Sequence, residues 1–586
     1  MKFKKVAEVF DAMEKESSRT AITKLLADLF TRATPDEAAI IAYLSLGSLQ
    51  ANYLGNQFNF AEKGFIPVIA SLLEILPTNV KHSLDALGDL GSVVERGSWE
   101  PASGDMLTIT DVHALLLRFV SISGQGSQDI KEEKMLKLLR VLDPLSAKYV
   151  VRVVLGQLRM GFSDMTLLDA FSWMEAGDKS LRQVLEDAYN VSADIGLIIK
   201  TLKKDGVAGV KAIGITPGIP IRPAAAERMA DAPSIFEKLG QCIAQPKIDG
   251  FRLQVHVDKR HGKHAIHFFS RNLQDMSAMF PDVKEAVDQL PVKTLVAEGE
   301  AIAFDPQTGI FLPFQETVKR KRKHNVAATA QDYPLKLFFF DALYIDGQSL
   351  LDSTHAQRRK LLCELLAHET QKQQAVIAPI EEIAMASAQA VSDYFQTCIA
   401  EGLEGIIVKR TDAIYQPGKR NFNWIKLKRE EAGSLDDTVD CVILGYYFGQ
   451  GKRASFGIGA LLVGIFNPEK DCFQTIAKIG TGLTDHEWKD IKKQCDAIRL
   501  HERLHNVACE KNLFPDVWVA PTLVCMIRAD EITRSPMHSA GAGKTKGGFA
   551  LRFPRLMGYR PDKSATDTTT IQEIGRLYQL QFSKKR

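Results

Sequence analysis

One short stretch decides how the middle of this chain folds and where its chemistry lies: Gln245-Pro246-Lys247-Ile248-Asp249-Gly250-Phe251-Arg252. It predicts a turn between two apolar segments, with an acid two residues after the lysine and an arginine five residues after it. A lysine amine is a useful nucleophile only when it is uncharged, which requires a pKa below its solution value of ~10.4. Partial burial and nearby cations favour the uncharged amine. We therefore interpret Lys247 as a candidate covalent nucleophile.

The composition is typical of a large globular protein. The chain has 586 residues, a net charge of +3 and 45% hydrophobic residues, and this length predicts roughly three or four domains. No apolar run approaches the ~20 residues of a membrane span, and the charged start at residues 1–5 does not resemble a signal peptide. The eight cysteines form no Cys-x-x-Cys pair, which disfavours a zinc motif and fits a reducing compartment. We expect a protein of the cytoplasm and nucleoid, or of a eukaryotic nucleus, with no membrane partner.

The first part of the chain is predicted to be helical. Apolar residues recur at three- and four-residue spacing in segments such as 132–139 and 147–154. Gly- and Ser-rich breaks separate such segments at 88–92 and 123–127. The backbone N–H groups of these breaks could bind phosphates, or the breaks could be plain helix connectors, and the sequence leaves both open. The proline-rich stretch 216–223 predicts a semi-rigid, extended linker.

The periodicity changes after this stretch. Short β-rich runs alternate with helices up to about residue 430, and they predict strands at 252–257, 265–269, 294–304, 335–344 and 405–409. This pattern is typical of an α+β domain with antiparallel sheets. From about residue 433 the runs become short and closely spaced, with strands predicted at 439–448, 460–466 and 473–479, as in a small OB-type barrel. We therefore expect three domains, at 1–212, 213–432 and 433–586.

Further polar and aromatic residues follow Lys247 in order, each within or beside a predicted strand: Arg271, Glu298, Glu300, Phe340, Glu404, Lys426 and Lys428. Lys426 and Lys428 share one face of their strand, because residues i and i+2 point the same way. A basic tail, Arg560-Pro561-Asp562-Lys563, closes the set. The cationic run 319–323 lies between two of these segments, which favours a phosphate-binding loop over an import signal.

This ordered set resembles the covalent nucleotidyltransferases, and among them the ATP-dependent DNA ligases of the replicative and archaeal type. The resemblance extends to Arg358-Arg359-Lys360 and to the segments 448–453, 478–482 and 532–536. The helical front third, including 156–161, resembles the DNA-binding domain of that family. The resemblance covers nearly the whole chain. It implies an all-α DNA-binding domain at 1–212, an adenylation domain at 213–432 and an OB-fold domain at 433–586.

The resemblance implies ATP-dependent sealing of 3′-OH/5′-phosphate nicks in duplex DNA, in replication, repair or recombination. Lys247 would attack the ATP α-phosphate to form lysyl-AMP, AMP would pass to the 5′-phosphate of the nick, and the 3′-hydroxyl would then displace it. Asp249 would be a base or an orienting group for that hydroxyl or its metal. Glu300 and Glu404 would hold Mg²⁺, with Mn²⁺ as an alternative. Glu300 is preferred to Glu298 because the family pattern has an acid followed by Ala, apolar, Ala, aromatic, Asp.

Five other residues are implied to bind the nucleotide. Arg252 and Arg271 would donate hydrogen bonds from their planar guanidinium groups to ribose, phosphate or nick oxygens. Phe340 would stack on adenine, as aromatic faces do with bases. Lys426 and Lys428 would hold the charge of the α-phosphate and favour the uncharged form of the nucleophile.

The basic tail and Gln245, at the two ends of this ordered set of residues, both bear on how ATP is recognised. In the family, the segment of Arg560 and Lys563 swings onto the ATP pyrophosphate for the first step and away for the later ones. Gln245 departs from the family, which usually has an acid there that accepts from the adenine amino group. An amide can accept the same hydrogen bond or present its NH₂ group to a different purine. The use of ADP, GTP or NAD is therefore open from the sequence.

Three other interpretations share part of this set. RNA ligases and capping guanylyltransferases carry the lysine motif, but the helical front third and the tail on a full barrel domain fit DNA ligases better. An NAD-dependent ligase would carry a four-cysteine zinc module, whose spacing these cysteines lack. Intact Lys247, Glu300 and Glu404 disfavour a DNA-binding scaffold with an inactive core. We expect a monomer that binds nicked double-stranded DNA through backbone phosphates, with a sliding clamp as a further candidate partner.

Overall fold

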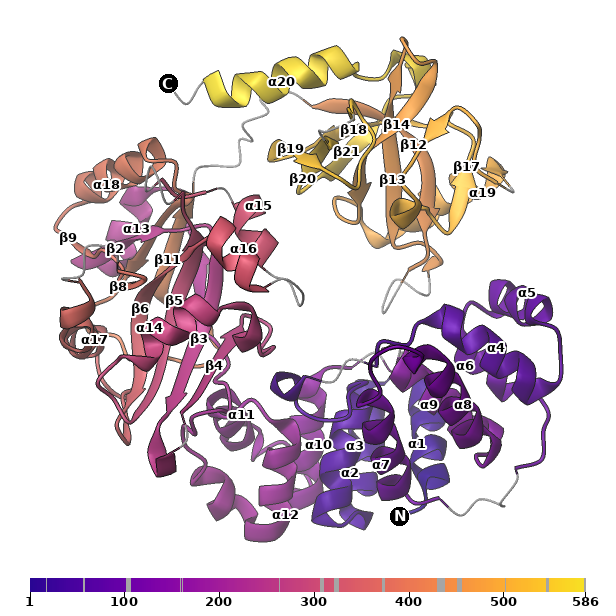
Figure 1. Cartoon of the computed structure of the whole chain (residues 1–586), viewed down its shortest axis with the longest axis horizontal. Coiled ribbons are helices and arrows are strands. Elements are labelled where there is room, and N and C mark those ends of the chain that lie inside the picture. The colour runs from indigo at the N-terminus through magenta and orange to yellow at the C-terminus, as the bar shows by residue number, and fades with distance from the viewer. Residues whose placement is uncertain are drawn as a thin grey trace. The chain divides into compact units, whose positions relative to one another are not determined.

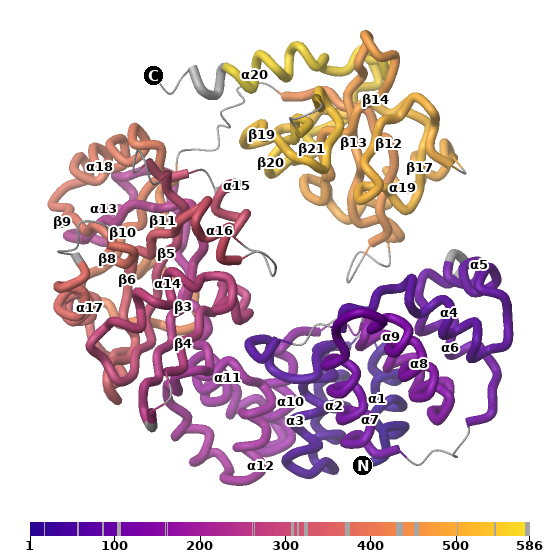
Figure 2. The backbone as a smooth tube through the Cα atoms, viewed as in Figure 1, coloured from indigo at the N-terminus to yellow at the C-terminus, as the bar shows by residue number. Residues whose placement is uncertain are grey.

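The computed structural model contains two units, Met1–Leu427 and Lys428–Arg586, whose backbones Figure 1 and Figure 2 trace. It describes residues 1–586 except 17, 56–57, 102–106, 157, 159, 161, 263, 306–309, 313, 321–325, 371–374, 429–437, 450–455, 501, 544–546 and 584–586. Parts of three segments that the sequence singled out, 156–161, 319–323 and 448–453, therefore lie outside the described residues.

Residues 3–211 fold into helices, as the periodicity predicts. These are α1 (Phe3–Lys15), α2 (Arg19–Arg32), α3 (Pro35–Ser45), α4 (Glu62–Leu73), α5 (Pro77–Leu87), α6 (Leu90–Glu95), α7 (Ile109–Val120), α8 (Ser127–Arg140), α9 (Pro144–Val154), α10 (Asp164–Ala176), α11 (Arg182–Val191) and α12 (Ile195–Lys211). Their apolar faces share one core, in which the rings of Phe30 and Phe171 meet edge to face at 4.9 Å. Within the described residues no single helix has the length and apolar composition to cross a membrane, and α4 and α5 meet that test only as a pair bent by 113°.

The break at 88–92 is a connector between α5 and α6. Asp89 caps α6 by accepting from the backbone N–H groups of Gly91 and Ser92, at 3.3 and 2.9 Å. Asp89 is buried and also pairs with Arg152, whose Nη2 lies 2.6 Å from Asp89 Oδ2. Asp89 therefore occupies the donors that the sequence offered to phosphates, and the phosphate-binding alternative is wrong for this break.

The proline-rich stretch 216–223 lies against the folded core. Ile221 is fully buried, and its N–H donates to Gln254 Oε1 at 2.7 Å while its carbonyl accepts from Gln254 Nε2 at 3.1 Å. The N–H of Gly218 donates to His256 Nδ1 at 3.0 Å. Burial lowers the pKa of His256 to about 3, so its ring stays neutral and can accept this bond. The stretch is a fixed strap and not the semi-rigid linker that its composition predicts.

Two sheets form the rest of the first unit. One has the strand order β1-β11-β10-β2-β9, and the other has the order β4-β3-β5-β6-β7 with β8 beside β6. The strands are β1 (Ala225–Arg228), β2 (Cys242–Lys247), β3 (Phe251–Asp258), β4 (Ala265–Ser270), β5 (Thr294–Ala303), β6 (Leu335–Ile345), β7 (Gln348–Ser349), β8 (Ile377–Pro379), β9 (Ile383–Met385), β10 (Gly405–Lys409) and β11 (Arg420–Lys428). The predicted strands match β3, β4, β5, β6 and β10 closely. The sheets are mixed and not purely antiparallel as predicted, because β1 pairs with β11 and β6 with β8 in parallel.

Helices cover the outer face of each sheet, and the inner faces pack on each other (Figure 1). The helices of this region are α13 (Ala232–Leu239), α14 (Pro281–Asp288), α15 (Phe314–Thr317), α16 (Val326–Asp332), α17 (His355–Thr370) and α18 (Ala388–Ala400). Apolar residues of α13 and α18 share a core with β2, β10 and β11, whereas those of α14 and α17 share a core with β3, β5 and β6. Buried residues of both sheets then meet in a third cluster, which includes Val296, Phe340 and Trp424. The polar residues of the inner faces are thereby brought together.

The second unit contains a curled sheet and a separate two-stranded sheet, the latter formed by Glu531–Ser535 and Gly548–Arg552. Its strands are β12 (Val439–Tyr447), β13 (Ala460–Asn467), β14 (Cys472–Ile479), β15 (Arg499–Leu500), β16 (Val507–Ala508), β17 (Val517–Val519), β18 (Val524–Arg528), β19 (Glu531–Ser535), β20 (Gly548–Arg552) and β21 (Arg555–Tyr559), and its helices are α19 (Asp485–Ala497) and α20 (Ile571–Ser583). β12 pairs with β13, β17 and β18, so one long strand serves both halves of the sheet. Trp488 of α19 is fully buried in the core. The predicted strands match β12, β13 and β14.

Candidate active site

Lys247 ends β2 on the inner face of its sheet. It stands opposite Gly405 of β10 in the antiparallel register. Ala244 of the same strand is buried in the core with α13 and α18, so Gln245 and Lys247 lie on the opposite face by strand alternation. The Lys247 ammonium forms an ion pair with Glu404, which precedes β10, although the two residues lie 157 positions apart in the chain.

The two lysines of β11 lie on the same inner face. Trp424, Lys426 and Lys428 alternate with Ile425 and Leu427, which are buried in the core with α13 and α18. Lys426 stands opposite Arg228 of β1, and Lys428 is the last residue of the strand. The strand period therefore directs Lys426 toward the side of the sheet that carries the nucleophile.

Arg252 of β3 is fixed by a buried carboxylate of β5, the neighbouring strand of the same sheet. Its Nη2 lies 2.8 Å from Glu298 Oε2, and its Nη1 donates to the carbonyl of Ala224 at 2.8 Å. The Tyr415 hydroxyl donates to the same Glu298 oxygen at 2.8 Å. The side chain of Glu298 is only 1% exposed, so Arg252 and Tyr415 compensate its charge. Glu298 is therefore an anchor for Arg252 and has no oxygen directed to solvent.

Glu300 is the more available of the two acids on β5. It stands opposite Arg252 in the β3–β5 register and accepts from the N–H of Gly250. Burial raises the pKa of Glu300 to about 7, the charges of Lys247 and Arg252 oppose this shift, and the charge of Asp249 adds to it. A buried carboxylate with a raised pKa is a common feature of functional sites. Glu298 is enclosed by Arg252 and Tyr415, whereas Glu300 is only partly buried.

Two aromatic rings line the space beside Arg252. Phe340 and Trp424 are 9% and 8% exposed and meet edge to face at 6.0 Å. The Arg252 guanidinium lies 5.4 Å from the first ring and 5.7 Å from the second. Lys409 Nζ lies 5.1 and 4.3 Å from the same rings, and burial lowers the pKa of Lys409 to about 8 although Asp341 acts against the shift. Lys409 and Trp424 were not among the predicted site residues, because only tertiary packing buries them.

Three further predicted site residues have other surroundings within their own units. Arg271 is exposed in the turn after β4 and makes no hydrogen bond or ion pair with any residue that the structure describes. Arg560 and Lys563 belong to the second unit, where both bind Asp440. Arg560 Nη1 and Lys563 Nζ lie 3.1 and 2.6 Å from Asp440 Oδ2. This carboxylate therefore neutralises the basic tail within its own unit.

The second residue of the cationic run at 319–323, Arg320, is structural. The side chain of Arg320 is fully buried, with Nη2 2.5 Å from Asp282 Oδ1. Lys319 Nζ donates to Glu316 Oε2 at 2.6 Å and to the Tyr333 hydroxyl at 3.1 Å. The phosphate-loop prediction is wrong for Arg320, which protein groups enclose and satisfy, and residues 321–323 lie outside the described part of the chain.

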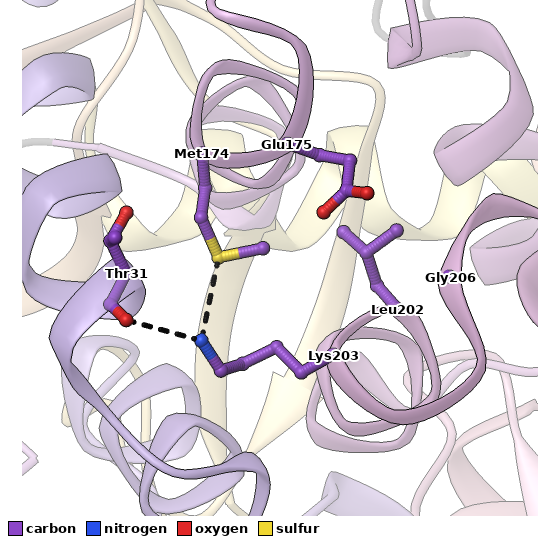
Figure 3. A pocket seen from close by; sticks show the side chains of 6 residues that line it. All are labelled: Thr31, Met174, Glu175, Leu202, Lys203 and Gly206. Atoms are coloured by element: carbon purple, nitrogen blue, oxygen red, sulfur yellow. Dashed lines mark hydrogen bonds between the residues drawn. The ribbon is translucent and has the colours of Figure 1, made fainter.

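A pocket in the helical region lies apart from these residues (Figure 3). Its volume is about 320 Å³, and its lining includes Thr31, Met174, Glu175 and Lys203. Lys203 Nζ donates to the carbonyl of Thr31 at 3.5 Å and lies 3.9 Å from Met174 Sδ, and burial lowers the pKa of Lys203. No residue of the predicted site lines this pocket, so it adds nothing to the chemistry around Lys247.

A lysine between carboxylates, beside a fixed guanidinium and two aromatic rings, is the arrangement expected of an enzyme that transfers a nucleotide through a covalent intermediate. Family models for the DNA ligase N terminus, the ATP dependent DNA ligase domain and the ATP dependent DNA ligase C terminal region match residues 2–172, 223–428 and 454–563. The chain belongs to the ATP-dependent DNA ligase family, whose members join breaks in DNA.

Relatives along the full length support this assignment. A probable DNA ligase of Dictyoglomus thermophilum is 43% identical over 100% of this chain and 99% of its own. DNA ligase 2 of Thermofilum pendens is 36% identical over 98% of this chain and 97% of its own. A solved structure described as Pmar-Lig_PreS3 is 16% identical with a TM-score of 0.56, over 95% of this chain and 99% of its own. The last likeness concerns the fold alone.

Proposed function

We propose that Lys247 carries the AMP group through the nick-sealing reaction of this ligase. Its amine attacks the ATP α-phosphate, an N–P bond forms, the bond to pyrophosphate breaks, and the amine loses a proton. The 5′-phosphate of a nick then displaces Lys247 and takes the AMP group. Finally the 3′-hydroxyl attacks that 5′-phosphate, closes the phosphodiester bond and releases AMP. The observation that carries this proposal is the position of Lys247, between Glu404 and Glu300 and on the inner face that holds Arg252 and the two rings.

Glu300 and Glu404 would hold Mg²⁺, with Mn²⁺ as an alternative. The two carboxylates come from different sheets, Glu300 from β5 and Glu404 from the position just before β10. They suit this ion, which takes one or two carboxylates and completes its shell with waters and phosphate oxygens. When bound, the metal supplies charge neutralisation on the triphosphate. The Lys247 ammonium pairs with Glu404, so engagement of Glu404 elsewhere would release the lysine side chain for its attack on ATP. Asp249 is close enough to Glu300 to influence its pKa, and we assign it to the 3′-hydroxyl, as base or orienting group.

The nucleotide would bind through the inner faces of both sheets. Arg252, held by Glu298, would present its guanidinium to ribose or phosphate oxygens. Phe340 would lie against the adenine. Lys426 and Lys428 would receive the α-phosphate, and exposed Arg271 would bind phosphates of the nicked DNA.

The three-domain division remains our proposal for the whole chain. The matches at 2–172, 223–428 and 454–563 support domains at 1–212, 213–432 and 433–586. We assign an OB fold to the last, because β12 serves both halves of its sheet and α19 follows β14. Arg560 and Lys563 would leave Asp440 for the ATP pyrophosphate in the first step.

DNA binding would rest on the helical domain and on phosphate contacts, since sealing any nick demands tolerance of sequence. In the break at 123–127, Gly124 and Gly126 have φ values of +96° and +74°, and its backbone N–H groups are candidates for such contacts. We propose a monomer that acts in replication, repair or recombination, with a sliding clamp as a candidate partner.

Sealing of a labelled nick tests the proposal. The protein, ATP and Mg²⁺ should convert a nicked duplex with a 5′-phosphate into a continuous strand, and a duplex with a 5′-hydroxyl should stay nicked. Lys247→Ala should lose this activity and still seal a nick that already carries 5′-AMP, because that substrate needs no lysyl-AMP. Failure of the wild-type protein on both phosphorylated and pre-adenylated nicks would contradict the proposed function.

A further inference from the structure

We propose that Glu382 sets the preference for ATP over GTP by fixing the rotation of the Gln245 side-chain amide. This inference rests on the proposed function, because it concerns the nucleotide that reaches Lys247. Gln245 is buried on β2, two residues before Lys247 and on the same face of the strand. Its Nε2 donates to Glu382 Oε2 at 2.7 Å. Glu382 follows β8 in the chain and was not among the residues that the sequence singled out.

The rotation of a glutamine amide is decided by its partners, because its oxygen and nitrogen ends have nearly the same shape. Glu382 determines the rotation of the Gln245 amide, because its carboxylate is ionised and can only accept hydrogen bonds. Burial acts to raise the pKa of Glu382, but a hydrogen bond from His355 and the charge of Arg359 prevail and lower it. His355 Nε2 lies 3.0 Å from Glu382 Oε2, and Arg359 Nε lies 3.7 Å from the same oxygen. An ionised Glu382 cannot donate to Gln245, so the NH₂ group must face it.

The other end of the amide is then an acceptor. Gln245 Oε1 accepts no hydrogen bond from any residue in the described part of the chain. Adenine carries an amino donor at its 6-position, whereas guanine carries an oxygen acceptor there. An oxygen held in place would accept from adenine and repel guanine, and the reversed amide would do the opposite. The Gln245–Glu382 pair thus supplies the acceptor that an acid at position 245 would supply alone.

Glu382 is a positioning residue in this scheme, and Glu382→Gln is its direct test. A neutral amide at 382 can donate or accept, so Gln245 becomes free to turn. We expect the ratio of ATP to GTP in the formation of the covalent nucleotide adduct to fall by roughly 10- to 100-fold, the range for leaving one polar group of a recognition site unpaired. The assay incubates pyrophosphate-treated protein with α-labelled ATP or GTP and measures label on the denatured chain over time.

Two further variants separate positioning from general damage. Glu381→Gln is the matched control, because Glu381 is the exposed neighbour and accepts from the Tyr394 hydroxyl at 2.8 Å. The ATP-to-GTP ratio of this variant should equal that of the wild type. The exchanged pair Gln245→Glu with Glu382→Gln restores a fixed acceptor at 245, because the new amide at 382 donates to it. That double variant should regain the ATP preference, which a merely structural role for Glu382 would not produce.

An unchanged ratio in Glu382→Gln would overturn the inference, and so would a double variant that still lacks the preference. If Glu382→Gln does not fold, the double variant decides alone: ATP preference supports the inference, and equal labelling by ATP and GTP rejects it. Absence of any adduct in the wild-type protein, after pyrophosphate treatment, would instead contradict the proposed function.

Discussion

Replacing Glu300 with glutamine tests the electrostatics of the site through stability instead of activity. The pKa of Glu300 rises from 4.5 to about 7 on folding, chiefly because of burial. At 1.36 kcal/mol per pKa unit, ionised Glu300 costs the folded state about 3 kcal/mol. As pH rises from 4.5 to 7, the unfolded chain releases this proton first, so the free energy of unfolding falls across that window and stays low above it. Glutamine cannot ionise, so Glu300→Gln should stabilise the protein by about 3 kcal/mol at pH 8 and by little at pH 4.5.

The assay is urea unfolding at pH 5 and pH 8, followed by tryptophan fluorescence without nucleotide or metal. Glu298→Gln provides the contrast two residues away. Its loss removes the carboxylate that is hydrogen-bonded to the Arg252 guanidinium, and breaking a buried pair in this way typically costs about 3–5 kcal/mol. Glu285→Gln, exposed on α14, controls for the loss of a carboxylate as such. The reasoning is refuted if Glu300→Gln is no more stable than the wild type at pH 8, or if its gain is the same at pH 5.

Three other substitutions test single features of the account. Lys563→Ala should slow self-adenylation at least about 10-fold and leave the sealing of a pre-adenylated nick nearly intact. Equal loss of both rates in a quench assay would reject the role of Lys563 at the pyrophosphate. Arg271→Ala should leave the thermal midpoint unchanged, because this side chain has no partner among the described residues. The transfer of AMP to the nick should become slower. An unchanged transfer rate would show that Arg271 does not belong to the active site. Gly250→Ala should destabilise the protein by about 2 kcal/mol, because its Cβ would lie 2.3 Å from the carbonyl oxygen of Ala301, and a calorimetric midpoint equal to that of the wild type would show that the turn can relax.

The strands and many of the residues around Lys247 could be predicted because local patterns determine them. Strand alternation places Gln245 with Lys247 and Lys426 with Lys428, whatever the sheet order. The pairing of β2 with β10 could not be predicted in this way, because it joins residues 157 positions apart. That pairing is what brings Glu404 to Lys247. The resemblance to a family supplied this long-range information, which periodicity does not contain.

The errors have a common physical cause. Arg320, Asp89 and Ile221 all lie in stretches whose composition is typical of exposed loops, yet each is buried by groups distant in the chain. Tertiary partners overrode the local pattern in each case: Asp282 for the cationic run, Arg152 for the glycine-rich break and Gln254 for the proline-rich strap. Lys409, Trp424 and Glu382 were missed for the same reason, since nothing in a strand or loop sequence shows which polar side chain will be enclosed.

The central claim is that Lys247 accepts AMP from ATP, and its most direct test is the isolation of that adduct. The protein, first stripped with pyrophosphate, is incubated with Mg²⁺ and either α-labelled ATP or adenylate-labelled NAD, then denatured and digested to locate the label. We predict label from ATP alone, on the peptide that contains Lys247, and none in Lys247→Ala. Label on another residue, label that survives in Lys247→Ala, or no label from ATP in the stripped wild-type protein would contradict the account.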